Sequence, residues 1–137
     1  MNTPLSNELF WLTLTLLMTS LLWVPYIINR MVSQGILRAL WDRYGSTFTE
    51  TKWSKRMMQA HENAIENIAI FAPLVLLIQI TGLNSATTTM ACMVYFFARL
   101  THYIAFTFAA PLLRVLTFLI GFGAQVTLAV MLLGMND

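Results

Sequence analysis

The side chains most capable of chemistry lie in two polar stretches that interrupt otherwise apolar sequence. In the first, RMMQAHENAIENIAIFAP at positions 56–73, four polar residues follow i, i+3, i+4, i+7 spacing and share one helical face: Gln59, Glu62, Asn63 and Glu66. The second stretch places Arg99 and His102 one helical turn apart. Ionisable side chains are costly inside a bilayer and need a partner or a hydrated pocket. If these stretches enter a membrane, they indicate a functional site.

The composition indicates a membrane protein. Of the 137 residues, 58% are hydrophobic and only 10% are charged, whereas a soluble domain has about 25% charged residues. The formal charge of +2 provides no broad basic face, so nucleic acid is not an expected partner. The single cysteine, Cys92, excludes an intrachain disulfide. No metal is expected, because one histidine among scattered acids lacks the paired spacing of a metal site.

Four apolar stretches have about the length that crosses a hydrocarbon core. They predict an all-α integral membrane protein, a bundle of four transmembrane helices in a single domain over residues 1–137. The expected spans are 9–28, 57–80, 87–108 and 112–133, and Pro25 and Pro73 should kink the first two. The connection at about 29–56 contains tryptophan, tyrosine and phenylalanine among its charges, which predicts a segment lying on the membrane surface.

The basic residues predict the orientation. Most fall on or beside the first connection, and Arg114 lies beside the third; the N-terminus, the turn at 81–86 and the C-terminus carry no lysine or arginine. By the positive-inside rule, the first and third connections are cytoplasmic and both termini are not. The short loops fit a bacterial cell membrane.

The two polar stretches should meet at one depth of the bundle. Glu66 lies as far beyond the start of the second span as Arg99 lies before the end of the third, in both cases on the order of 13 Å. By the same count His102 lies near the level of Asn63, and Arg114 lies at the cytoplasmic mouth. One interpretation is an ion pair that pins two helices together, and another is a proton relay. The size of the polar set favours a third, a hydrated pocket for a charged ligand.

The side chains also predict the kind of ligand. Arginines bind carboxylates in bidentate fashion, and a carboxylate accepts hydrogen bonds from an ammonium group. A small zwitterionic or peptide-like anion therefore fits this pocket. The sequence contains no serine-hydrolase elbow and no Gly-rich phosphate loop.

Three motifs, in order along the chain, resemble the MAPEG family, the membrane-associated proteins in eicosanoid and glutathione metabolism. The first is R-x-x-x-A-H-x-N-x-x-E-N from Arg56 to Asn67. The second is Arg99-Leu100-Thr101-His102 followed by Ala105-Phe106, and the third is PLLRVLTFLIGFG at 111–123. The likeness is greatest to the branch of microsomal glutathione transferases and prostaglandin E synthases.

The resemblance implies a homotrimer that binds glutathione, as a co-substrate, between neighbouring subunits near the cytoplasmic side. The family's glutathione contacts carry over to Asn63, Glu66, His102 and Arg114, and more loosely to Arg30. Arg99 matches the family's third-helix arginine, so Arg99 and Arg114 are the expected catalytic residues that stabilise a thiolate. The implied activity is that of a glutathione-dependent transferase or peroxidase. Its lipophilic electrophiles would arrive through the surrounding lipid.

One position departs from the family pattern. Phe106 stands where catalytic members of this branch carry a tyrosine, whose hydroxyl lies near the sulfur of glutathione. Phenylalanine cannot donate that hydrogen bond, so Arg99 or Tyr103 would have to substitute for it. The alternative is a non-catalytic membrane protein that binds lipid or another ligand. Whether the chain is an enzyme is therefore left open by the sequence.

Overall fold

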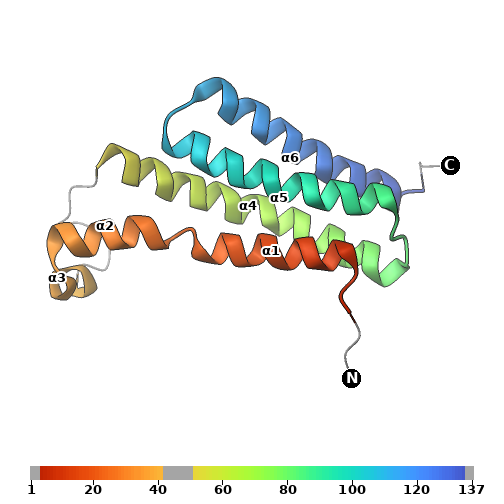
Figure 1. Cartoon of the computed structure of the whole chain (residues 1–137), viewed down its shortest axis with the longest axis horizontal. Helices are drawn as coiled ribbons and strands as arrows, with labels where there is room; N and C mark the ends of the chain where they lie inside the picture. The colour runs from red at the N-terminus through yellow and green to blue at the C-terminus, as the bar shows by residue number, and fades with distance from the viewer. Residues whose placement is uncertain (1–3, 42–50, 135–137) are drawn as a thin grey trace.

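Six α-helices make up the part of the chain that the computed structural model describes, residues 4–41 and 51–134. They are α1 (Asn7–Leu21), α2 (Val24–Gln34), α3 (Ile36–Trp41), α4 (Lys52–Thr81), α5 (Ala86–Thr107) and α6 (Pro111–Leu132) (Figure 1). The predicted all-helical class is confirmed for these residues. Part of the segment predicted to lie on the membrane surface, residues 42–50, is outside the described ranges.

The long helices run side by side, and α5 packs against α1, α4 and α6. The start of α1 and the end of α6 lie near the turn between α4 and α5, and we call this the terminal end of the bundle (Figure 1). The other end holds α3, the start of α4 and the α5–α6 turn (Figure 1). We call it the basic end because the positive charges gather there, among them Arg38, Lys52, Lys55 and Arg114.

The first apolar stretch is broken into two helices. Proline cannot donate a backbone hydrogen bond, and its ring crowds the preceding turn. Accordingly α1 ends at Leu21, and Pro25 lies in the first turn of α2. The carbonyl of Leu22, at the break, accepts a 2.9 Å hydrogen bond from the buried hydroxyl of Tyr103 on α5. The kink expected at Pro25 is therefore a break that α5 stabilises.

Pro73 behaves differently, because α4 continues through it from Lys52 to Thr81. Neighbouring helices can compensate for a missing bond of this kind in a membrane bundle. The helix ends at Gly82, whose φ of 71° is the left-handed conformation that glycine adopts without strain. Ser85 and Thr88 then form a capping box that starts α5.

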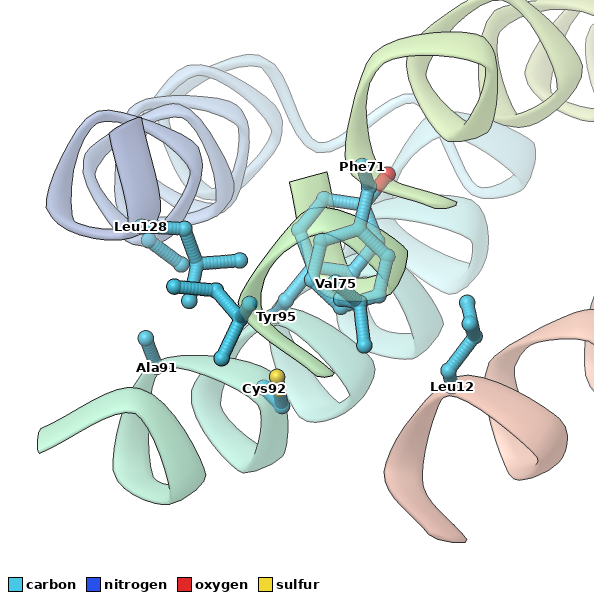
Figure 2. Packing of buried hydrophobic residues seen from close by; sticks show 9 residues of the cluster. Leu12, Phe71, Val75, Ala91, Cys92, Tyr95 and Leu128 are labelled. Carbon is cyan, nitrogen blue, oxygen red and sulfur yellow. The ribbon is translucent and has the colours of Figure 1, made fainter. Parts of the chain in front are cut away.

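Two apolar clusters hold the helices together, and polar side chains separate them along α4 and α5. The larger cluster occupies the terminal half and includes the stacked rings of Phe71 and Tyr95, with centroids 3.7 Å apart (Figure 2). The smaller one, in the basic half, consists of Leu22, Ala60, Ala64 and Tyr103. Arg99 lies between the two clusters on α5, and it forms a polar layer with Asn63, which lies at the edge of the smaller cluster on α4.

Three helical stretches are long and apolar enough to cross a membrane: Asn7–Gln34, Lys52–Thr81 and Pro111–Leu132. Their outer faces expose large apolar side chains, such as Leu17, Leu77 and Leu119, as expected of surfaces in contact with lipid. The fourth expected span, α5, has the length but is not among them. Its threonines, Arg99 and His102 lower the hydropathy of this helix.

Candidate functional site

Arg99 lies at the centre of the polar layer. Only 3% of its surface is exposed, and its Nη2 donates a 2.6 Å hydrogen bond to Oδ1 of Asn63 on α4. Its Nε is buried and has no hydrogen-bond partner among the described residues. Buried polar groups normally have partners, and a charged group without one is especially costly. The guanidinium is therefore held by Asn63 through Nη2, and its Nε remains available to donate to another group.

The polar layer extends from Asn63 to α6. The side-chain Nδ2 of Asn67 donates to the backbone oxygen of Asn63 at 2.8 Å. Gln125 on α6 is buried, and its Nε2 donates to the backbone oxygen of Asn67 at 3.1 Å. Sequence reasoning missed Gln125; its only signal was a lone amide in the middle of an apolar helix. These contacts join three helices at the level of Arg99.

A glycine on α6 makes room for the arginine. A Cβ added at Gly121 would lie 3.4 Å from Cδ of Arg99 and 3.9 Å from a side-chain atom of Tyr95. The bare backbone of Gly121 therefore lets the Arg99 side chain lie close against α6. A side chain larger than alanine at this position would push the guanidinium away from Asn63.

His102 lies one turn beyond Arg99 and lines a cavity of about 210 Å³ between α5 and α6. The side chain is 3% exposed, and its Nδ1 has no partner among the described residues. The other lining residues are Phe106, Arg114, Val115, Phe118 and Leu119. The cavity thus combines apolar walls with an imidazole and a guanidinium.

Arg114 lies half-buried in the first turn of α6, with its guanidinium carbon 5.2 Å from the centre of the Phe106 ring. Stacking on a ring holds a guanidinium in place while leaving its donors available. Phe106 also contacts the His102 ring, with centroids 5.8 Å apart. The structure therefore places Arg114 and His102 on one cavity, with Phe106 between them.

An ion pair between Glu66 and Arg99, one of the interpretations of the two polar stretches, is not observed among the described residues. Glu66 is exposed on the outer surface of α4, as are Gln59 and Glu62, and Arg99 bonds to Asn63 instead. Equal depth along two helices does not fix the direction in which each side chain points. Of the four polar residues sharing a face of α4, Asn63 alone is turned partly inward. Within one subunit Glu66 therefore does not reach the Arg99 guanidinium.

Arg30 lies on α2, which follows the break and packs against α4. It is half-buried and does not line the cavity between α5 and α6. The contact between α2 and α4 includes a 2.8 Å hydrogen bond between the hydroxyl of Tyr26 and Nδ1 of His61. Arg30 is therefore positioned by α2 and is not among the residues that line the cavity with His102 and Arg114.

A second buried polar cluster, missed by sequence reasoning, lies at the terminal end. Glu8 is 2% exposed and accepts hydrogen bonds from Asn84 at 2.9 Å, Thr88 at 2.7 Å and Thr89 at 3.0 Å. These contacts tie the start of α1 to the α4–α5 turn and the first turn of α5. Because neutral donors surround the carboxylate, we read this cluster as a structural clamp.

Fold and site together define a helical membrane protein with an arginine-containing polar layer buried between its helices. The model of the MAPEG family matches residues 9–134, and the chain belongs to that family. No curated protein and no solved structure matches this chain significantly. The resemblance inferred from the motifs is thus confirmed at the level of the family, while its branch stays a prediction.

Proposed function

We propose that this protein is a glutathione-dependent membrane transferase or peroxidase acting on lipophilic electrophiles. The observation that carries the proposal is a pair of buried nitrogens, Nε of Arg99 and Nδ1 of His102, that have no partner among the described residues. His102 lines a cavity together with Arg114, and Arg99 lies one helical turn away from His102. The two guanidinium groups favour an anionic ligand, and membership of the MAPEG family supports glutathione as that ligand.

The proposed chemistry requires a thiolate, because a thiol is a poor nucleophile. Arg99 and Arg114 would stabilise the thiolate by their charge, while Asn63 holds Arg99 in place. The cavity volume of about 210 Å³ suits the thiol-bearing part of a tripeptide rather than the whole molecule. The rest of glutathione would extend over the outer surface of α4.

A second subunit would contribute side chains to the part of the site on the outer surface of α4. Glu66 is exposed and Arg30 lies on α2, so one subunit alone does not gather all the predicted contacts. In the proposed homotrimer, Arg30 of one subunit would face Glu66 of its neighbour across bound glutathione. The lipophilic co-substrate would reach the sulfur through the lipid between subunits.

We further propose that α5 is the fourth transmembrane span. It runs alongside α4 and α6, both of which are apolar enough to cross a membrane. A helix that is surrounded by others can carry polar residues because few of them meet lipid. Four spans place both termini on one side, and the basic residues at the opposite end assign that end to the cytoplasm.

Glutathione binding to the purified protein in detergent, measured by calorimetry, tests the proposed site. We expect Arg99→Ala and Glu66→Ala each to abolish binding, because each removes a charge that the ligand would contact. Arg38→Ala is the matched control, since Arg38 is exposed on α3. Retained binding in both site variants would refute the proposal.

A non-catalytic role in binding lipid or another ligand is the second candidate. The two rings that contact His102, Phe106 and Phe118, both lack a hydroxyl. If the protein binds glutathione without reacting, Phe106→Tyr would supply a hydrogen-bond donor beside the cavity. A large gain in conjugation by this variant, with unchanged affinity, would indicate a binding protein derived from an enzyme.

A further inference from the structure

The cavity between α5 and α6 contains one side chain that can accept a proton. Its lining consists of His102, Phe106, Arg114, Val115, Phe118 and Leu119. An arginine stays protonated at neutral pH, and the other four side chains are hydrocarbons. A thiol entering this cavity therefore meets a single possible base, the imidazole.

The surroundings of His102 leave that base available. The ring lies between two phenylalanines, with centroids 5.8 Å from Phe106 and 6.1 Å from Phe118. Neither ring can donate a hydrogen bond from a hydroxyl to the imidazole, and Nδ1 has no partner among the described residues. The imidazole is thus packed between two aromatic rings, and its Nδ1 is left without a partner among the described residues.

We infer that His102 is the proton acceptor that ionises the thiol, a role that rests on the proposed glutathione-dependent function. The proton of the S–H group moves to an imidazole nitrogen, and the sulfur keeps the electron pair. That pair forms the new bond from sulfur to the electrophile. The imidazolium then gives its proton to the anion formed on the adduct or, where chloride departs, to water.

The neighbouring charges are compatible with this transfer. Arg99 on the same helix and Arg114 on α6 are the charged groups that act on the His102 ring. From α4 the nearby polar layer presents neutral Asn63, while Glu62 and Glu66 are exposed on the outer surface. Proton transfer creates imidazolium and thiolate together, so the total charge of the site does not change. The thiolate formed between the two arginines offsets their repulsion of the imidazolium.

The test compares His102→Gln with the wild-type protein, using glutathione and 1-chloro-2,4-dinitrobenzene over a range of pH. Glutamine can form hydrogen bonds but cannot take up the proton. We expect a glutathione affinity within a few fold of wild type and a conjugation rate at neutral pH reduced by about 10²-fold or more. The deficit should shrink as the pH approaches about 8.5, where a free thiol ionises unaided.

Two further measurements separate proton transfer from positioning. The ultraviolet absorbance of the thiolate should appear when wild-type protein binds glutathione, and it should be lost in both His102→Gln and His102→Asn. His61→Gln, which changes the chain's other histidine at the contact between α2 and α4, should retain the rate and its pH profile.

The outcomes distinguish this inference from the proposed function. An unchanged rate in the His102 variants, or an equal loss at every pH, would overturn the role of His102 alone. Wild-type protein that binds glutathione without forming thiolate would do the same. Wild-type protein that binds no glutathione would overturn both.

Discussion

Arg99 is a buried cation, and its hydrogen-bond acceptor on α4, Oδ1 of Asn63, is neutral. Replacing that amide by a carboxylate would supply an internal counter-ion at hydrogen-bond distance. We therefore expect Asn63→Asp to lower the affinity for glutathione at least tenfold, because the new carboxylate competes with the ligand for the guanidinium. Calorimetry measures the affinity, and thermal unfolding should show no loss of stability.

The exposed residue Asn7 provides a control with the same chemical change at the opposite end of the bundle. Asn7→Asp should leave glutathione affinity unaltered. Wild-type affinity in Asn63→Asp would show that the ligand does not use the Arg99 charge. Asn63→Leu should instead destabilise the fold by about 1–3 kcal/mol, because it leaves the buried guanidinium without its acceptor.

Among the elements, α1 is tied at its start to the α4–α5 turn and to α5 by the hydrogen bonds of Glu8. Near its start, Oε1 of Glu8 accepts from Thr88 and Thr89, and Oε2 accepts from Asn84. Glu8→Gln would leave a single amide oxygen as acceptor for the three donors that two carboxylate oxygens now accept. We expect a loss of about 1–3 kcal/mol of stability, since one buried donor then lacks an acceptor. Thermal unfolding in detergent, followed by circular dichroism, measures the change.

Glu62→Gln is the matched control, because Glu62 is exposed on α4. Its melting temperature should equal that of the wild type. Equal melting temperatures for the Glu8 and Glu62 variants would show that the carboxylate cluster contributes nothing to holding α1 in place. Glutathione binding, at the other end of the bundle, should survive in both variants.

For the whole molecule, the positions of Arg30 on α2 and Arg99 on α5, together with the proposed site between subunits, predict complementation between subunits. Arg30→Ala and Arg99→Ala should each lack glutathione binding when expressed alone. If the site lies between subunits, co-expression creates some interfaces that pair an intact Arg30 with an intact Arg99. We therefore expect partial recovery of binding in purified mixed oligomers, whose subunit number native mass spectrometry gives. The absence of any recovery would contradict a binding site shared between two subunits.

The sequence was sufficient to predict the helical class and the family. It did not predict which residues of the two polar stretches contact each other: Arg99 bonds to Asn63, which the residue count had placed at the level of His102. Counting residues gives the height of a side chain along a helix, whereas its direction depends on packing, such as the stack of Phe71 on Tyr95 and the close approach of Arg99 to Gly121. Gln125 escaped prediction because its partner is a backbone oxygen, which any residue supplies.

The polarity of α5 has a consequence for how the chain enters the membrane during synthesis. An arginine near the centre of a helix adds roughly 2.5–3.5 kcal/mol to the cost of insertion, and α5 lacks the hydropathy of the three apolar stretches. On the proposed four-span topology, α5 is therefore poorly suited to pass from the insertion machinery into the lipid by itself. The short turn at 108–110 joins it to α6, against which it packs along its length (Figure 1). The two helices are best suited to insert as a hairpin, in which the favourable insertion of the apolar α6 offsets the cost of inserting Arg99 on α5.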